Sequence, residues 1–165
     1  LLIGYVLCVS AGSVLCNGTE SFGRSFVGYT LIVVPIGAVL STFLPYYSGT
    51  VIASAFLGTA LIAGGMVLLA AVKPEIFENL GGTLFTALLI AIVVQLLLTL
   101  FRISSGMLDW AIVVIFAGYI GYDWCMANRC YPSPVNAVKS ACALYLDLVN
   151  IFIRLVAIFG RNDRS

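Results

Sequence analysis

Two aspartates inside apolar runs are the residues of this sequence best suited to chemistry: Asp123 in GYIGYDWCMA and Asp147 in ALYLDLVNIF. Two carboxylates brought together at low dielectric cannot both ionise cheaply, so they would share a proton. Sharing the proton would hold their two segments together. Losing it would add like-charge repulsion and leave oxygen ligands suited to a hard cation such as calcium, bound transiently.

Few other groups in the chain could do comparable chemistry. The sequence contains no histidine, the side chain that usually titrates near neutral pH. Its five cysteines are an odd number and none forms a CxxC pair. We therefore expect buried free thiols, no zinc or haem site and no resident cofactor.

The composition indicates where these aspartates lie. Hydrophobic residues make up 62% of the 165 residues and charged residues only 9%, whereas roughly a quarter of a typical soluble domain is charged. The mean hydropathy is +1.12. The sequence predicts an integral membrane protein whose main partner is the lipid bilayer, and a net charge of +1 provides no basic face for nucleic acid.

Hydrophobic runs divide the chain into six segments, each near the roughly 20 residues needed to cross about 30 Å of hydrocarbon. They are residues 1–16, 26–46, 51–72, 82–102, 107–126 and 136–159. Short loops rich in turn residues join them, which favours antiparallel neighbours. We predict an all-α polytopic transmembrane bundle forming a single domain over residues 1–165. Because the chain begins with Leu1 and not Met, we expect it to be N-terminally truncated.

Asp147 is expected to face the interior of the bundle, because a charged aspartate at the centre of a membrane helix costs about 2.5–3.5 kcal/mol. A polar stripe at steps of three or four residues passes through it: Ser140, Ala143, Asp147, Asn150 and Arg154. Arg154 is expected to extend toward the far interface, with a role as counter-ion for the carboxylates as the alternative. Asp109 is expected at a helix start, in contact with water.

The last two segments should pack antiparallel, with Asp123 and Asp147 in the same half of the membrane. If the last helix begins near Pro134, Asp147 lies deeper than Asp123, so contact requires a tilt. The lysines and arginines of the loops favour a cytoplasmic location for that half. One side carries Arg24, Lys73, Arg129 and Lys139, and the other carries Arg102, Arg161 and Arg164.

The stretch GYIGYDWCMA, followed by NAVKSACALYLDLVNIFIRLVAIFG, resembles the C-terminal signature of the Bax inhibitor-1 family, especially its bacterial members. FVGYTLIVVPIGAVLSTFLP is similar to the third helix of that family and SAFLGTALIAGGMVLL to the fourth. The resemblance implies a seven-helix fold in which the other six helices surround the last. Residues 1–16 would correspond to the second helix.

The resemblance also implies a function. The paired aspartates of the family fall on Asp123 and Asp147, where they form a pH-sensitive latch at the cytoplasmic mouth of a calcium leak pathway. Arg24 is the nearest candidate for an arginine that joins the latch in some bacterial members, displaced by about two residues. We predict a pH-sensitive calcium leak channel of the bacterial plasma membrane, supported by Asn150 and Arg154, with calcium as the permeant ion.

Two alternatives belong to other functional classes. The first is a regulatory membrane protein that binds a membrane-bound AAA-type protease, as some bacterial relatives do. The second is an intramembrane hydrolase with an aspartate pair, but the sequence lacks a GxGD stretch around the second aspartate. We therefore predict that the protein is not an enzyme.

Overall fold

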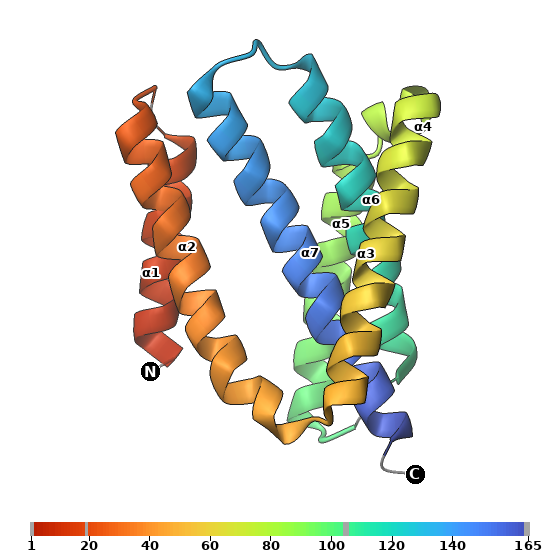
Figure 1. Cartoon of the computed structure of the whole chain (residues 1–165). Helices are drawn as coiled ribbons and strands as arrows, with labels where there is room; N and C mark the ends of the chain where they lie inside the picture. Colours follow the sequence, from red (N-terminus) through yellow and green to blue (C-terminus); the bar gives the residue numbers. More distant parts are fainter. Residues whose placement is uncertain (1, 19, 104–105, 164–165) are drawn as a thin grey trace.

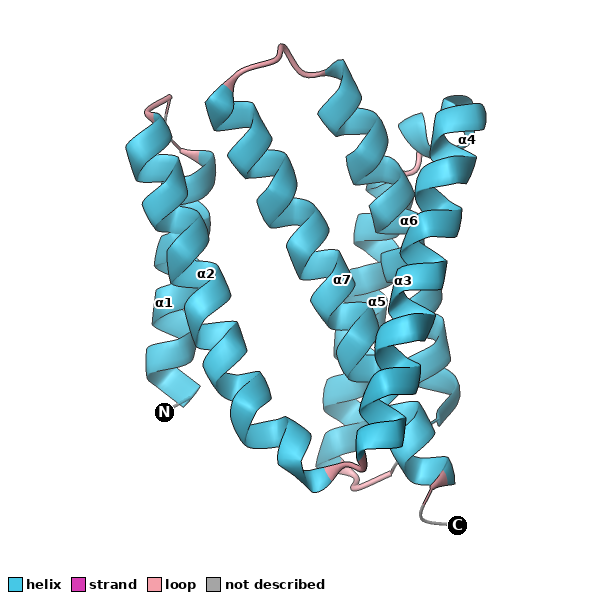
Figure 2. Cartoon of the chain, in the orientation of Figure 1, coloured by secondary structure: helices cyan, strands magenta, loops and turns pink. Residues whose placement is uncertain are grey.

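The computed structural model describes residues 2–18, 20–103 and 106–163, without the side chains of residues 2–6 and 162. This part of the chain is helical and contains no strand (Figures 1 and 2). The long helices are α1 (Leu2–Asn17), α2 (Phe22–Phe43), α3 (Gly49–Val72), α5 (Gly81–Leu100), α6 (Gly106–Arg129) and α7 (Pro134–Asn162). A 3₁₀ turn, η1 (Leu44–Tyr46), follows α2, and a short helix, α4 (Pro74–Glu78), precedes α5. Leu1 and Arg164, which the sequence predictions included, lie outside the described residues.

Each of the six predicted segments corresponds to one long helix, with ends that differ by at most four residues. The hydrophobic runs and the turn residues between them therefore predicted the helices correctly. The stretch around α4 was wrongly predicted to be only a loop. Pro74 suits the first turn of this helix, where its missing N–H removes no hydrogen bond. Phe77, only 2% exposed, holds α4 against α6 beside Gly121.

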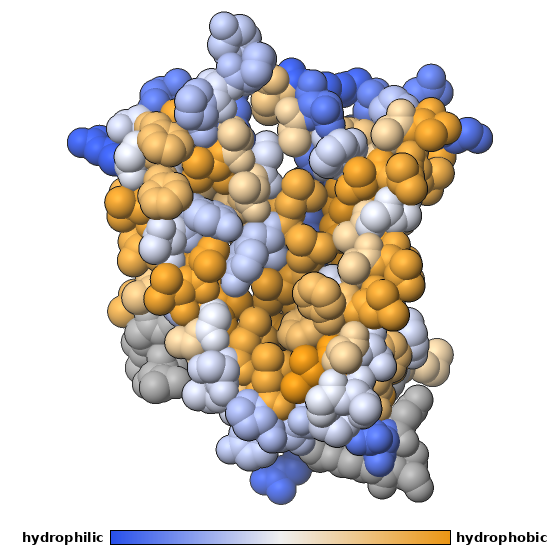
Figure 3. Space-filling model, in the orientation of Figure 1, coloured by the Kyte–Doolittle hydropathy of each residue, from blue (hydrophilic) through white to orange (hydrophobic). Residues whose placement is uncertain are grey.

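Five helices of the described chain are long and apolar enough to cross a membrane: α2 with η1, α3, α5, α6 and α7. The prediction of six spans differs at α1, whose 16 residues rise only about 24 Å at 1.5 Å per residue. Figure 3 shows an apolar surface around the middle of the molecule and hydrophilic residues gathered toward its two ends. This distribution is that of a polytopic membrane protein.

Helix α7 occupies the centre of the bundle, as predicted for the last helix, and packs against α1, α2, α3 and α6 (Figure 1). The main core joins α3, α6 and α7. It consists of small and branched side chains: Val51, Ala55, Val113, Ile120, Ile151, Leu155, Val156 and Ile158. Branched and small residues let helices approach closely, so α6 and α7 are held firmly along this part of their contact.

Toward their connecting loop, α6 and α7 diverge (Figure 1). Helix α6 ends at Arg129 and α7 begins at Pro134. The Ser133 hydroxyl caps α7 by accepting a hydrogen bond from the Asn136 backbone N–H at 3.1 Å. The sequence predicted that contact between Asp147 and Asp123 requires a tilt of this kind.

Candidate functional site

The structure brings Asp123 of α6 and Asp147 of α7 together. Their carboxyl groups lie within hydrogen-bonding reach of each other. Asp123 is half-buried, whereas Asp147 is only 4% exposed. A carboxylate has no hydrogen to donate, so a hydrogen bond between them requires a proton on one of the two groups. Two carboxyl groups in this arrangement could share one proton.

No arginine or lysine in the described residues forms an ion pair with either carboxyl. The three ion pairs found there involve only Glu78 and Asp109 as acids. One oxygen of Asp147, Oδ2, is buried without a hydrogen-bond partner among the described atoms. A buried carboxylate whose charge is not balanced destabilises the folded protein. A proton or a bound cation would balance the charge that no described side chain balances.

Tyr119 belongs to the same site, although the sequence analysis did not identify it. It lies one turn before Asp123 on α6, and its phenol interacts electrostatically with both carboxyl groups. The signal was present in the sequence, because residues four apart lie on the same face of a helix. A phenol can both donate and accept a hydrogen bond, so Tyr119 is a polar group in the electrostatic surroundings of the pair.

Two of the predicted supporting residues, Arg24 and Asn150, make no ion pair or hydrogen bond with the pair among the described contacts. Arg24 on α2 is exposed and makes no ion pair within the described part of the chain. Asn150 lies about one turn beyond Asp147, and its side-chain amide donates to the Leu146 carbonyl at 2.8 Å. Asn150 is thus anchored to its own helix.

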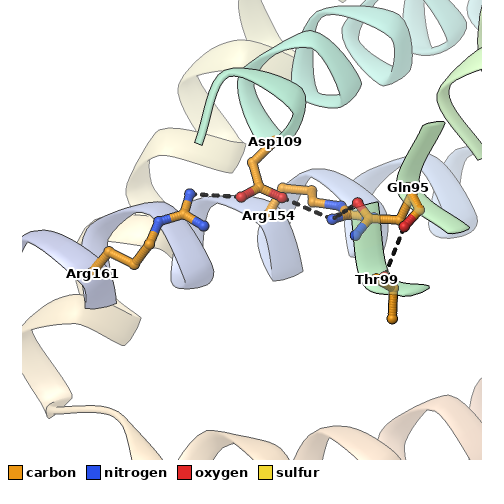
Figure 4. Close-up of polar contacts among 5 residues, drawn as sticks. All are labelled: Gln95, Thr99, Asp109, Arg154 and Arg161. Carbon is orange, nitrogen blue, oxygen red and sulfur yellow. Dashed lines mark hydrogen bonds and ion pairs between the residues drawn. The ribbon is translucent and has the colours of Figure 1, made fainter. Parts of the chain in front are cut away.

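Arg154 does not extend toward the interface as expected, and the carboxylate that it binds is Asp109 (Figure 4). Its Nη1 lies 2.8 Å from Asp109 Oδ1 and donates to Gln95 Oε1 at 3.2 Å. Arg161 Nη2 contacts the other oxygen of Asp109 at 2.6 Å. Asp109 was expected to contact water, but it is only 6% exposed, because both guanidinium groups of α7 cover it.

One alignment of α6 against α7 accounts for two contacts, that of Asp123 with Asp147 and that of Asp109 with Arg161. Asp109 lies 14 residues before Asp123 on α6, and Arg161 lies 14 residues after Asp147 on α7. In an antiparallel pair, a contact between Asp123 and Asp147 therefore implies a contact between Asp109 and Arg161. At 1.5 Å per residue the two contacts are about 21 Å apart along the helices.

A cavity of about 250 Å³ lies between the two sites, with polar groups of Gln95, Asn150 and Arg154 in a mainly apolar wall. Polar residues of α7 thus continue from Asp147 toward Arg161.

No group of three or more His, Cys, Asp or Glu residues able to hold a metal ion occurs within residues 2–18, 20–103 and 106–163. Calcium takes six to eight oxygen ligands, so two carboxylates suit transient contact better than tight binding.

Comparisons with known proteins agree with this architecture. The sequence model described as "Inhibitor of apoptosis-promoting Bax1" matches residues 1–164. An uncharacterised membrane protein of Streptococcus pyogenes serotype M1 is 37% identical over 172 residues, covering 98% of this chain and 73% of the relative. The inner membrane protein YbhL of Escherichia coli K12 is 32% identical over 155 residues, covering 86% and 65%.

A eukaryotic relative is also similar. Bax inhibitor 1 of Schizosaccharomyces pombe is 28% identical over 152 residues, which cover 88% of this chain and 56% of the relative. The chain therefore spans between about half and three quarters of the length of these relatives. No solved structure matches the chain.

Proposed function

This chain belongs to the Bax inhibitor-1 family of membrane proteins, and we propose that it is a pH-sensitive calcium leak channel gated by Asp123 and Asp147. The observation that carries the proposal is the contact between these two carboxyl groups inside membrane-spanning helices, with no arginine or lysine paired to either one in the described residues. Such a pair depends on a proton for its stability.

The shared proton would keep the gate closed. It ties α6 to α7 beyond the buried residues of their main core, on the side of the loop that joins the two helices. Loss of the proton replaces a hydrogen bond by repulsion between two carboxylates at low dielectric. Helix α7 leans away from α6 toward that loop (Figure 1), so the repulsion acts in the direction in which the helices can separate.

The deprotonated pair would attract a divalent cation. Two carboxylates carry a charge of −2, which matches that of calcium, and their oxygens are ligands that this hard cation prefers. Because the pair offers fewer ligands than a storage site, the ion would leave again easily. A low flux of calcium that increases as the pair loses its proton is the expected behaviour.

The direct test measures calcium uptake into liposomes that contain the full chain, at a series of pH values between about pH 6 and pH 8. Uptake should be faster at the higher pH. Asp123→Asn and Asp147→Asn should each flatten this dependence, because an amide donates a hydrogen bond to the remaining carboxyl group without titrating. Asp163→Asn is the matched control, since Asp163 is exposed and hydrogen-bonded to Ser48 away from the pair.

Two results would count against the proposal. Uptake equal to that of empty liposomes at every pH would exclude a leak, and an unchanged pH dependence in both pair variants would exclude the gate. The alternative, a regulator of a membrane-bound AAA-type protease, predicts a protease that co-purifies with the protein whether or not either aspartate is replaced.

A further inference from the structure

We propose that Asp109, Arg154 and Arg161, the far-end triad, form a second gate that controls cation entry by its charge, with Arg161 as the residue that moves. This role rests on the proposed function, because a gate presupposes a path. The triad connects the beginning of α6 to the C-terminal half of α7 (Figure 4). It therefore lies at the opposite end of the helix pair from Asp123 and Asp147.

The triad lies along the same two helices as the aspartate pair. The triad and the aspartate pair are about 21 Å apart in a common register of α6 and α7. Between them, Asn150 and Arg154 line the cavity of about 250 Å³. Arg154 belongs to both the cavity and the triad. An ion that passes between the two ends along α7 must therefore pass this residue.

The charge of the triad opposes a cation. A guanidinium group carries one positive charge, so one carboxylate and two arginines carry a net charge of +1. Asp109 is 6% exposed, and a charge surrounded by protein is screened less than one in water. With all three residues in contact, the site repels calcium.

The two arginines are not held equally. Arg154 binds Asp109 and Gln95, and its side chain is 28% exposed. The Arg161 side chain is 43% exposed, and Asp109 is its only ion-pair partner within the described chain. Separating Arg161 from Asp109 therefore costs less free energy than separating Arg154 from Asp109. The departure of Arg161 leaves a neutral Asp109–Arg154 pair, which removes the electrostatic barrier without exposing an unpaired carboxylate.

A purely structural role for these ion pairs predicts something different. Arg161→Gln and Asp109→Asn both break the same contact between α6 and α7, so a loss of structure would act in one direction in both variants. Their charges change in opposite directions. Arg161→Gln lowers the net charge of the triad from +1 to zero, whereas Asp109→Asn raises it to +2. Opposite effects of the two substitutions identify electrostatic control.

The test uses a thiol placed in the cavity by Asn150→Cys in the full chain, reconstituted in liposomes. We would measure its rates of reaction with a cationic and an anionic methanethiosulfonate reagent. The chain without this substitution provides the blank, because Cys130 is exposed. The ratio of cationic to anionic rates should rise at least about threefold with Arg161→Gln and fall at least about threefold with Asp109→Asn, since each changes one unit charge near the thiol.

Arg102→Gln is the matched control. It removes one positive charge from an exposed residue in the connection between α5 and the start of α6, outside the triad, and should leave the ratio unchanged. The proposal is overturned if the two triad variants change the ratio in the same direction, if neither changes it, or if the thiol reacts with neither reagent in any variant.

This readout does not require calcium flux, so it separates the two proposals. Calcium uptake measured in parallel should increase with Arg161→Gln and decrease with Asp109→Asn. Opposite changes in the rate ratio without any calcium uptake would refute the leak and still establish that the triad controls access of charged molecules to the cavity. Uptake that depends on pH without changes in the ratio would refute the triad alone.

Discussion

At the scale of single residues, three aspartates of α6 and α7 differ mainly in what surrounds them. Asp109 has two guanidinium partners, so its charge is compensated permanently. Asp123 and Asp147 lie next to each other and form no ion pair with an arginine or lysine of the described residues. The same side-chain type thus forms ion pairs with arginines at one end of the helix pair and a contact between two carboxyl groups at the other.

We expect Arg154→Leu to lower the free energy of unfolding by about 3 kcal/mol, because it removes one partner of a buried carboxylate. Arg161 remains bound to Asp109 and limits the loss. Arg129→Leu is the control: Arg129 pairs with Glu78, but its side chain is 55% exposed, and such pairs contribute about 0–1 kcal/mol. Unfolding of both variants in detergent measures the difference. Equal losses would show that the contacts of Arg154 contribute no more than a surface ion pair.

The sequence revealed the residues of the aspartate pair more readily than those of the triad. Asp123 and Asp147 are conspicuous because carboxylates are rare within apolar runs. The pairing of Asp109 with Arg161 follows from equal spacing along α6 and α7, but only after the contact between Asp123 and Asp147 is known. The Arg154–Gln95 bond joins residues 59 positions apart. No local pattern predicts such a contact.

At the scale of helices, the predicted ends were close because hydrophobic runs alternate with Gly, Pro and Ser. Helix α4 was missed because five residues are too few to show a helical period. The tilt of α7 was recognised only as a requirement for contact. Tilt depends on the side chains that pack between helices, so the sequence of one helix does not determine it.

The crossing of α1 and α2 provides a test of helix packing. A Cβ atom on Gly28 would lie 2.7 Å from the Gly12 carbonyl oxygen, and backbone cannot move aside as a side chain can. Gly28→Ala should therefore lower the free energy of unfolding by about 1–3 kcal/mol.

Gly37→Ala on the same helix is the control for Gly28→Ala, because no described atom outside the local helix backbone lies within 4 Å of its added Cβ. Alanine favours helices over glycine by up to about 1 kcal/mol, so this variant should be as stable as the parent or more stable. Thermal unfolding of both variants in the same detergent makes the comparison. A Gly28→Ala protein as stable as the Gly37→Ala protein would contradict the close approach of α1 and α2.

At the scale of the whole molecule, the aspartate pair and the far-end triad are associated with opposite ends of the bundle. The end near the aspartate pair carries Arg24, Lys73 and Arg129 in addition to Lys139. The loop from α6 to α7 lies at this end, and the connection from α2 to α3 lies at the other (Figure 1). Membrane proteins retain lysines and arginines of short loops in the cytoplasm. The aspartate pair would then respond to cytoplasmic pH, while the triad faces the other compartment.

This orientation can be tested with the cysteines that the chain already contains. Cys130 is exposed beside the loop from α6 to α7, whereas Cys16, Cys125 and Cys142 are buried. A membrane-impermeant maleimide should leave Cys130 unlabelled in intact cells and label it after permeabilisation. Thr50→Cys, exposed at the opposite end, should be labelled in intact cells. Cys130→Ser identifies the signal. Labelling of Cys130 from outside intact cells would show that the orientation is the opposite one. External pH would then control the aspartate pair.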